Sequence, residues 1–550
     1  MYRPDLSPLA DSLGLSALVA LLPLIAIFVL LGVLRVRAHV AALVSVAVAV
    51  AVAVIAYGMP PGLALLAASE GAAFGLFPIM WIVLAAVWVY RLTVASGRFD
   101  DLRRSFQLIS DDHRVQAIVI AFCFGGLLEA LAGFGAPVAI TGVMLTGLGL
   151  PPVRAAVAVL VANTAPVAYG AIATPIITAG ALTGIPYEEI GARVALQTPV
   201  LALFVPLVLA FLVDGRRGLR QTWPAALVCG IAFAIGQFTA ATFVSVELTD
   251  IIASLVALAA TVLFLRFWKP SGDAGAAAGT YEGDRDGPVP PANGGTATRT
   301  LPAAGPRLNT GRVVMALLPY LIIIGVFALA KLWTPLKEAL LAQDVLIEWP
   351  GLHGQVLTAA GKVSSATVYT LSWLSSPGTL LLMAGVVVAA CYRLSPATAA
   401  REFAGVLVQL RWAFLTVASV LALAYVMNLS GQTVTVGAWI AGTGAAFAFL
   451  SPILGWLGTA VTGSDTSANA LFATMQQTAA TKAGLDPTLL VAANTSGGVV
   501  GKMISPQNLT IAVTAVGLDG QEGRLFRMTI RWSLLFLLGL CLLTLAQSLV

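Results

Sequence analysis

The sequence predicts an all-α polytopic membrane protein with about 12 transmembrane helices, two re-entrant hairpins and two inverted-topology repeats that contain broken helices. Composition is the first reason, because 59% of the 550 residues are hydrophobic and 10% are charged, whereas a soluble domain is about 25% charged. Long apolar runs are the second reason, since about 20 apolar residues in a helix cross the hydrocarbon of a bilayer. The third is a set of motifs that recurs in the two halves of the chain.

Twelve apolar runs are long enough to cross a membrane, and their recurrence to the end of the chain argues against a soluble enzyme with a large buried core. They lie near residues 15–34, 38–57, 62–92, 153–184, 194–213, 223–241, 249–267, 312–332, 377–392, 412–429, 487–517 and 530–549. Two further stretches, 116–150 and 434–480, are interrupted by Gly, Pro, Ser and Thr, and each is expected to contain a re-entrant hairpin. Residues 434–450 remain open as an extra crossing.

The apolar runs and the polar segments between them divide the chain into four predicted parts. The first run lacks a basic segment before it and is long, so we expect a retained span rather than a cleaved signal peptide. Residues 333–376 are partly polar and are expected to lie outside the membrane with a short amphipathic helix. The predicted parts are a first repeat at 1–214, a connecting transmembrane hairpin at 215–269, a disordered cytoplasmic linker at 270–311 and a second, inverted repeat at 312–550.

Positive charge predicts the orientation. Arg and Lys gather in alternate loops, which the positive-inside rule places in the cytoplasm. Representative members of these clusters are Arg35, Arg103, Arg216, Lys269, Arg393, Arg411 and Arg527. Both termini then lie outside the cytoplasmic membrane, as do the acidic loops at Glu188–Glu189 and Glu247–Asp250. The first half therefore starts outside and ends inside, and the second half runs the opposite way.

The two halves share a spaced motif. Gly133 is followed by Asn163 after 30 residues and by Pro175 after a further 12. Gly463 is followed by Asn494 after 31 residues and by Pro506 after a further 12. Inverted repeats with broken helices at corresponding positions are typical of secondary transporters, in which the breaks mark the substrate site.

These breaks supply the candidate substrate-binding residues. Unwound backbone at membrane depth is costly unless it lines a cavity or binds a ligand, and half-helix N-termini favour anions. Close packing of helices through small residues is the alternative reading of the glycines. The candidates are Gly133, Gly135, Asn163, Thr164, Ser464, Thr466, Ser467, Asn494, Thr495, Ser496 and Lys502.

Ionisable residues within apolar segments are costly and are therefore functional candidates. Lys502 is the candidate counter-charge for a substrate carboxylate, or else the partner of Asp465 or Glu129 in a salt bridge. Burial favours the neutral form of a carboxyl group, so Glu129, Asp465 and Glu70 are candidates for carrying a coupling proton. Structural hydrogen bonding is the alternative for Glu129 and Asp465, and an interfacial position is the alternative for Glu70.

Other classes of site find little support. The four cysteines show neither metal-ligand spacing nor a disulfide framework. The three histidines fall in predicted loops, so neither a metal site nor a histidine proton relay is expected. The sequence lacks a phosphate-binding Gly-rich loop with Lys-Ser/Thr. The net charge of +5 comes from Arg and Lys residues in the predicted cytoplasmic loops, so it does not indicate nucleic-acid binding. No cofactor is expected.

At these residues the sequence resembles the L-lactate permease family. The resemblance rests on LEALAGFGAPVAI at 128–140, VANTAPVAYGAIATP at 161–175, TGSDTSANALF at 462–472 and NTSGGVVGKMISPQN at 494–508. It covers nearly the whole chain except 270–311. It implies uptake of L-lactate, and often of glycolate or D-lactate, across the cytoplasmic membrane together with a proton. The linker is the departure, and it holds no candidate site residue.

Two other functions remain open. A sodium-coupled or dicarboxylate carrier would also use hairpins and broken helices, although a dicarboxylate calls for more positive charge than Lys502 alone supplies. An integral membrane enzyme is the alternative from another class, but the breaks show neither a nucleophile–base pair nor a metal cluster.

Overall fold

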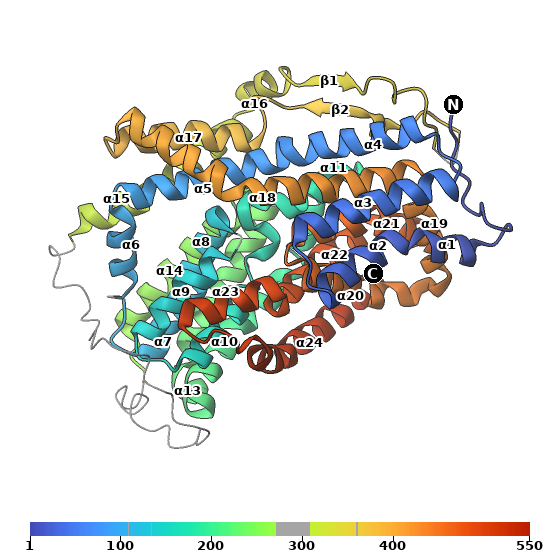
Figure 1. Ribbon diagram of the computed structural model, residues 1–550. Coiled ribbons are helices and arrows are strands. Elements are labelled where there is room, and N and C mark those ends of the chain that lie inside the picture. The colour runs from blue at the N-terminus through green and yellow to red at the C-terminus, as the bar shows by residue number, and fades with distance from the viewer. Residues whose placement is uncertain (108, 134, 271–308, 359–360, 550) are drawn as a thin grey trace.

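Helices make up almost all of the protein. The computed structural model describes residues 1–107, 109–133, 135–270, 309–358 and 361–549. Long helices run side by side along one direction of the molecule, as Figure 1 shows for α3, α4 and α18. The predicted linker at 270–311 falls almost entirely outside the described residues. Within the described part, one short hairpin of two antiparallel strands is the only sheet.

The first elements form three helical segments long enough to cross a membrane, followed by a short polar helix. Three candidate spans cover Leu13–Val33, Ala38–Ile55 and Pro61–Ala95. They are built from α1 (Leu13–Ala20), α2 (Leu22–Phe28), η1 (Val29–Val33), α3 (Ala38–Ile55), α4 (Pro61–Phe74), η2 (Gly75–Met80) and α5 (Trp81–Ala95), followed by α6 (Arg98–Gln107).

The first hairpin and the first broken helix follow. A chain reversal at Gly133 separates the two arms of the hairpin, and a bend of 62° breaks the next helix. The elements are α7 (His113–Ile118), η3 (Val119–Phe124), α8 (Gly125–Ala132), α9 (Ala136–Gly147), α10 (Pro152–Ala162), η4 (Val167–Tyr169), α11 (Gly170–Thr183) and α12 (Tyr187–Val194).

The connecting segment is a helical pair. The two predicted crossings, 194–213 and 223–241, lie in α13, where the chain breaks at Asp214 and Gly215 and folds back on itself. A Cβ on Gly230 would lie 2.4 Å from the carbonyl oxygen of Leu203, so the two parts of α13 pack side by side. The elements are α13 (Thr198–Thr239), η5 (Ala240–Val244) and α14 (Thr249–Phe267).

The second half begins with helices around the polar segment. Residues 333–376 contain a short helix, as the sequence predicts, and also the strand hairpin. The elements are α15 (Thr310–Leu332), α16 (Thr334–Leu341), β1 (Val345–Glu348), η7 (Ser365–Thr367), β2 (Val368–Leu371), α17 (Pro377–Cys391) and α18 (Pro396–Leu429).

The second hairpin and the second broken helix complete the chain. Residues 434–450 form α19, η8 and the start of α20, and α19 spans only nine residues. Such a helix is about 14 Å long and cannot cross the bilayer alone. The elements are α19 (Gln432–Ile440), η8 (Ala441–Ala446), α20 (Phe447–Thr462), α21 (Asp465–Ala483), α22 (Pro487–Gly501), η9 (Lys502–Ile504), α23 (Pro506–Val516) and α24 (Glu522–Gln547).

The predicted fold class is confirmed. Ten helices in the described residues are long and apolar enough to cross a membrane, or 11 if the bent pair α10 and α11 is one span. The protein is therefore a multi-pass membrane protein. The predicted number of about 12 crossings and the inverted relation of the halves stay predictions, because α17 has only 15 residues and α10 and α11 form one bent pair.

Small residues let the long helices pack backbone to backbone. A Cβ on Gly71 of α4 would lie 2.4 Å from the carbonyl oxygen of Leu421 in α18. A Cβ on Gly75 would lie 2.9 Å from Ala418 Cα. Close approach of this kind is how membrane helices gain packing without a hydrophobic drive between them. These contacts hold α18 beside α4, and α18 also contributes residues to the candidate site.

Candidate functional site

The first hairpin turns on glycine. Gly133 has φ 34° and Gly135 has φ 86°, a region that residues with a side chain rarely occupy. A Cβ on Gly135 would also lie 2.2 Å from Ile511 Cδ1 in α23. Glu129 lies one helical turn before this reversal, in α8, and it is 2% exposed.

The first broken helix contains an uncommon backbone segment. After α10 ends, Asn163 begins a turn that leads through η4 to α11. The first residues of α11 include Ala171, Ile172 and Ala173, with φ values of 45°, 56° and 57°. Each left-handed residue with a Cβ costs about 1–2 kcal/mol. Three in succession store strain at the point where this helix faces the second hairpin.

The second hairpin also turns on glycine. Gly463 has φ 78°, and a Cβ there would lie 2.5 Å from Gln507 Oε1. Ser464 then caps α21, since its Oγ accepts a hydrogen bond from the backbone N–H of Ser467. Asp465 is the first residue of α21 and is 3% exposed. The start of α21 therefore presents backbone N–H groups, hydroxyls and one carboxyl at the same place.

The second broken helix packs tightly against the second hairpin. A Cβ on Gly497 would lie 1.9 Å from the carbonyl oxygen of Pro452, and one on Gly498 would lie 1.9 Å from Asp465 Oδ1. After α22, the 3-10 turn η9 carries Lys502, and Ser505 caps α23 through its hydroxyl. Glycine at 497 and 498 thus lets α22 approach α20 and the Asp465 carboxyl.

Each hairpin packs against the broken helix of the other half of the chain. In the first half, α9 of the hairpin packs against α23, which is the second arm of the other half's broken helix. In the second half, α21 of the hairpin packs against α11, which is the corresponding arm in the first half. The same type of contact therefore occurs twice, with the halves interchanged.

A cavity of about 300 Å³ lies where these elements meet. It is a size suited to a small ligand. Its lining comes from both hairpins, both broken helices and three scaffold helices: Glu129, Gly133, Val167, Gly170, Ala171, Thr174, Pro175, Thr462, Gly463, Ser464, Asp465, Thr466, Ser467, Lys502 and Gln507, with Ala38, His39, Val83, Trp412, Ala413, Thr416 and Val417.

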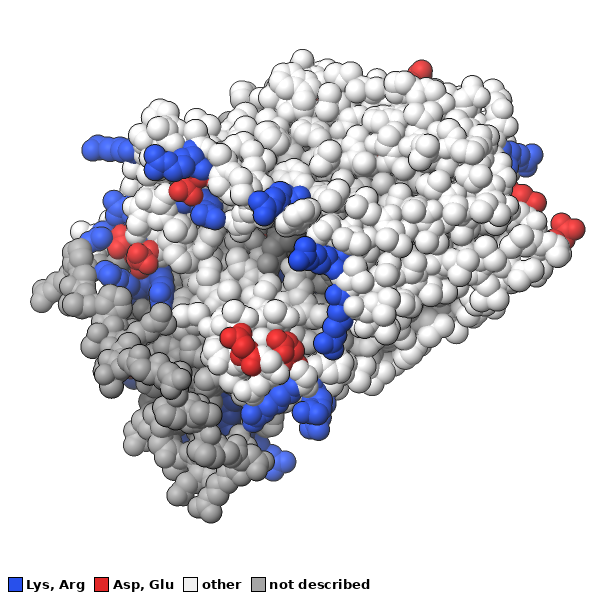
Figure 2. Space-filling view, in the orientation of Figure 1, with Lys and Arg blue, Asp and Glu red and all other residues white. Residues whose placement is uncertain are grey.

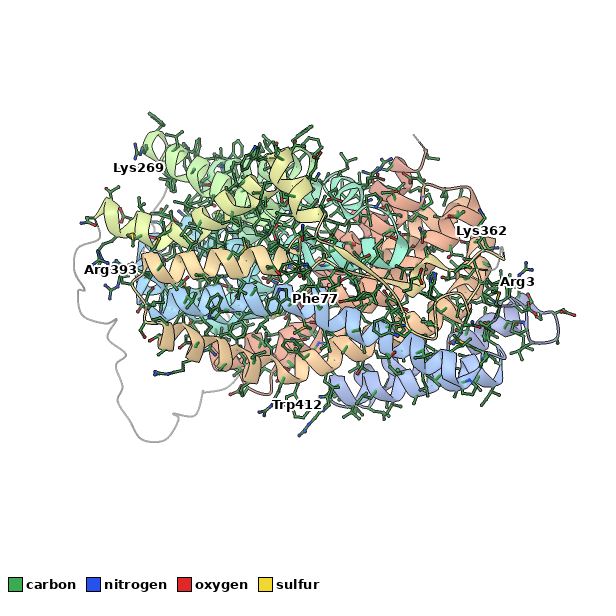
Figure 3. All side chains as sticks on the ribbon, turned by 90° about the horizontal axis from the view of Figure 1, so that it is seen from above. Arg3, Phe77, Lys269, Lys362, Arg393 and Trp412 are labelled. Atoms are coloured by element: carbon green, nitrogen blue, oxygen red, sulfur yellow. The ribbon has the colours of Figure 1, made fainter. Side chains whose placement is uncertain are left out.

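One side of the cavity approaches the surface. His39 at the start of α3 stacks on Trp412 of α18 with ring centroids 4.4 Å apart. Trp412 is 51% exposed, and it lies at the edge of the molecule in Figure 3. Arg411 extends over its ring, 5.6 Å from the centroid. In Figure 2, basic side chains border a hollow in this part of the surface, between α18 and the start of α3.

The ammonium group of Lys502 interacts with two carboxyl groups that line the cavity, those of Glu129 and Asp465. Its Nζ lies 2.5 Å from Glu129 Oε1, so the ion pair joins the first hairpin to the second broken helix. Among the described residues, the second oxygen of Glu129 has no hydrogen-bond partner. Lys502 also acts electrostatically on Asp465, whose Oδ1 accepts a hydrogen bond from Thr459 Oγ1 at 3.4 Å and whose Oδ2 has no partner.

The structure brings together about half of the predicted site residues. Those that line the cavity are Glu129, Gly133, Ser464, Asp465, Thr466, Ser467 and Lys502. The salt bridge that the sequence left as an alternative for Lys502 is present, with Glu129 as the partner. The assignment of these residues to substrate and proton stays a prediction.

The other predicted residues lie outside the cavity. Gly135 serves the contact with Ile511. Asn494 and Thr495 donate hydrogen bonds to Asn469 Oδ1 at 3.0 and 2.9 Å, and Ser496 donates to Gln197 Oε1 at 2.7 Å. These bonds hold α22 to its neighbours, and none of the three residues is among those that line the cavity.

Three further candidates differ in their surroundings. Thr164 donates to the carbonyl oxygen of Val161. Asn163 is buried, and neither atom of its amide has a partner. Glu70 is 1% exposed in α4, with both oxygens unpartnered, beside Gly71 in the contact with α18.

Sequence reasoning missed several cavity residues. Gln507 directly follows Pro506 of the repeated motif, and its position there was the available signal. Thr174, Thr416 and Thr462 also line the cavity, but a threonine in an apolar run carries no signal of its own. Within the described residues, no three His, Cys, Asp or Glu side chains gather as a metal site.

Comparison with known proteins identifies the family. The family model for L-lactate permease matches residues 16–550. The chain belongs to the L-lactate permease family. Glycolate permease GlcA of Escherichia coli K12 is 43% identical over 100% of this chain and 97% of its own length. The L-lactate permeases of Bacillus subtilis 168 and Escherichia coli K12 are each 42% identical over 98% of this chain, and over 97% and 96% of their own lengths.

Membership in the L-lactate permease family confirms the resemblance that the motifs indicated. The family is one of permeases, so the cavity belongs to a transporter. The solved structure of the Alcanivorax borkumensis YdaH transporter aligns over 87% of this chain and 86% of its own, with 15% identity and a TM-score of 0.43.

Proposed function

We propose that this L-lactate permease family member takes up L-lactate across the cytoplasmic membrane together with a proton, and that it also accepts D-lactate and glycolate. The observation that carries the proposal is the ion pair between Lys502 and Glu129, both of which line the cavity. The relatives support the substrates, because their names are L-lactate permease and glycolate permease. Both compounds are small 2-hydroxy monocarboxylates.

Charge balance links the substrate to a proton. Lys502 is the only Lys or Arg side chain among the described residues that line the cavity. A substrate carboxylate that binds its ammonium group displaces Glu129. A buried carboxylate without a cation is costly, so Glu129 takes up a proton as the substrate binds. Each monocarboxylate is then carried with one proton, and no net charge crosses the membrane.

The start of α21 completes the binding site. A helix N-terminus carries unpaired N–H groups and a partial positive charge that suit a carboxylate. We place the substrate carboxylate between Lys502 and this N-terminus. The hydroxyls of Thr466 and Ser467, which line the same cavity, are placed to bond the 2-hydroxyl group.

The two halves are proposed to be inverted repeats, 1–214 and 312–550, joined by the hairpin at 215–269 and the cytoplasmic linker at 270–311. The exchange of partners between α9 and α23 and between α11 and α21 supports this. In such transporters one bundle moves against the other around a fixed site. The hairpins and broken helices would then move together relative to α3, α5 and α18.

The coupling ion is tested by transport in proteoliposomes. Radiolabelled L-lactate uptake is measured under an imposed pH gradient and, separately, under a sodium gradient, with the uptake of protein-free liposomes subtracted. We expect the pH gradient alone to drive accumulation. Uptake driven by sodium alone would overturn proton symport in favour of the sodium-coupled alternative. Competition by succinate stronger than that by glycolate would favour a dicarboxylate carrier instead.

A further inference from the structure

A third buried carboxyl lies just outside the cavity, on α14. Asp250 is in the first turn of this helix, where it is 0% exposed. Neither of its oxygens has a hydrogen-bond partner among the described residues. An ionised carboxylate buried without partners is costly. The environment of Asp250 therefore accommodates the protonated group, although the sequence placed this residue with an outer acidic loop.

One close approach and one electrostatic interaction place Asp250 beside Glu129. A Cβ on Gly126 of α8 would lie 2.4 Å from Ser254 Oγ of α14. Glu129 lies about one turn after Gly126 in α8, and Asp250 lies about one turn before Ser254 in α14. The charges of these two acids act on each other. The two helices thus run antiparallel at this contact, and the two acids occupy matching levels.

The surroundings of Asp250 hold few other ionisable groups. Tyr169 of η4 and Lys502 of η9 act on it electrostatically, and Gln237 of α13 is its polar neighbour. Gln237 is otherwise engaged, since its Nε2 donates to the carbonyl oxygen of Ala165 and its Oε1 accepts from Thr198. Lys502 is the one cation of this group, and it is already paired with Glu129.

We propose that Asp250 is a second proton-carrying residue, which passes its proton to Glu129 when a substrate carboxylate takes Glu129's place on Lys502. The inference rests on the proposed function. One ammonium group cannot neutralise two carboxylates and a substrate anion together, and nearby like charges disfavour joint ionisation. Glu129 and Asp250 therefore hold at least one proton between them while Lys502 binds substrate.

The cycle balances in protons. While Glu129 pairs with Lys502, Asp250 is protonated. When substrate binds, the O–H bond of Asp250 breaks and an O–H bond forms on Glu129. When substrate leaves to the cytoplasm, Glu129 releases this proton into the cavity and pairs with Lys502 again. Asp250, at the predicted outer end of α14, takes up a proton from outside water as it gives one to Glu129, so its buried carboxyl is not left ionised.

The test compares net uptake with exchange in proteoliposomes. A pH difference of about 2 units supports about 100-fold accumulation of a monocarboxylate carried with one proton. Asp250→Asn keeps the size of the side chain but cannot give up a proton. We expect it to exchange external labelled lactate for internal lactate at a rate near that of the unmodified protein, while accumulation under the pH gradient falls to that of protein-free liposomes.

Ser254→Ala is the matched control. Ser254 lies one turn away on the same helix, is equally buried and has an unpartnered hydroxyl, so its loss should leave both modes unchanged. Unimpaired accumulation by Asp250→Asn would overturn the inference. If Asp250→Asn loses both modes, Asp250→Glu decides, because recovery of both supports a proton-carrying carboxyl and continued loss of both assigns a structural role. Absence of lactate exchange in the unmodified protein would instead refute the proposed function.

Discussion

At the residue scale, the charges of the site converge on a single ammonium group. Lys502 contacts Glu129, acts on Asp465 and influences Asp250 from its place on η9. A group with three acidic neighbours is held in place when the cavity is empty. It is also attractive to a further carboxylate once a neighbour is protonated. Under the proposed function, this arrangement would let one residue serve both substrate binding and proton coupling.

Replacement of Lys502 tests this directly. Lys502→Ala leaves Glu129 buried without its cation, and loss of one member of a buried pair costs about 3–5 kcal/mol. The variant also loses the proposed bond to the substrate carboxylate, which is worth about 1.5–3 kcal/mol, so we expect the KM for lactate exchange to rise about 10- to 100-fold or uptake to vanish. Lys482→Ala, at an exposed position on α21, is the control. Near-normal exchange by a folded Lys502→Ala protein would remove Lys502 from the site.

An ion pair between half-buried Lys331 and buried Glu247 lies away from the cavity and should affect stability rather than transport. Lys331 Nζ lies 2.9 Å from Glu247 Oε1, and Tyr187 and Ser245 donate further hydrogen bonds to this carboxylate. Burial favours a higher pKa for Glu247, but the charge of Lys331 and these hydrogen bonds outweigh it and lower the pKa below its usual value.

Lys331→Met should therefore lower the free energy of unfolding by about 3 kcal/mol at neutral pH. The pair stabilises the fold fully above the pKa that Glu247 has in the unfolded chain. This stabilisation is lost as the pH falls through the lower folded value. Thermal unfolding in detergent at neutral and acidic pH measures the difference, with the exposed Lys337→Met as the control. An unchanged melting temperature at neutral pH would contradict the expectation.

At the scale of elements, the broken helix α10–α11 stores strain beside the cavity. Ala173 has φ 57° and is fully buried, whereas Ala179 lies in the regular part of the same helix and is equally buried. Glycine relieves a left-handed backbone but weakens a regular helix by about 1 kcal/mol. We expect Ala173→Gly to leave stability unchanged or slightly raised and Ala179→Gly to lower it. Equal losses in thermal unfolding would show that residue 173 is not strained.

The sequence predicted the elements better than their contacts. Glycine and polar residues in apolar runs predicted the hairpins near Gly133 and Gly463, and both glycines do take the positive φ that residues with a side chain rarely adopt. The same reasoning placed Asn494 and Ser496 in the site, although both bond to neighbouring helices. Asp250 was missed because it stands beside Glu247 at the start of an apolar run, so the two acids were interpreted as an outer loop, whereas Asp250 is buried.

At the scale of the whole molecule, the exchange of partners between halves ties the cavity to both. Glu129 comes from the first half and Lys502 from the second, so neither half forms the site alone. Movement that separates α8 from η9 would break this ion pair unless a substrate carboxylate and a proton replace it. Under the proposed function, this ion pair would oppose movement without substrate and proton, which would favour coupled transport over leakage.

The orientation in the membrane can be tested at the two ends of the molecule. Lys269 and Arg393 lie at one end in Figure 3, and Arg3 and Lys362 lie at the other. The positive-inside rule places the first pair in the cytoplasm, because further basic loops surround it. Single cysteines are introduced as Arg393→Cys and Lys362→Cys after serine replaces the four native cysteines, of which Cys391 is exposed.

A membrane-impermeant maleimide applied to intact cells should label Lys362→Cys and leave Arg393→Cys unlabelled until the cells are opened. Lactate uptake by each variant shows that the fold is retained. Labelling of Arg393→Cys alone in intact cells would reverse the assignment. The rim at His39 and Trp412 would then face outward. With the predicted orientation, Arg35 and Arg37, which precede His39, lie on the cytoplasmic side, so we expect this rim to face the cytoplasm.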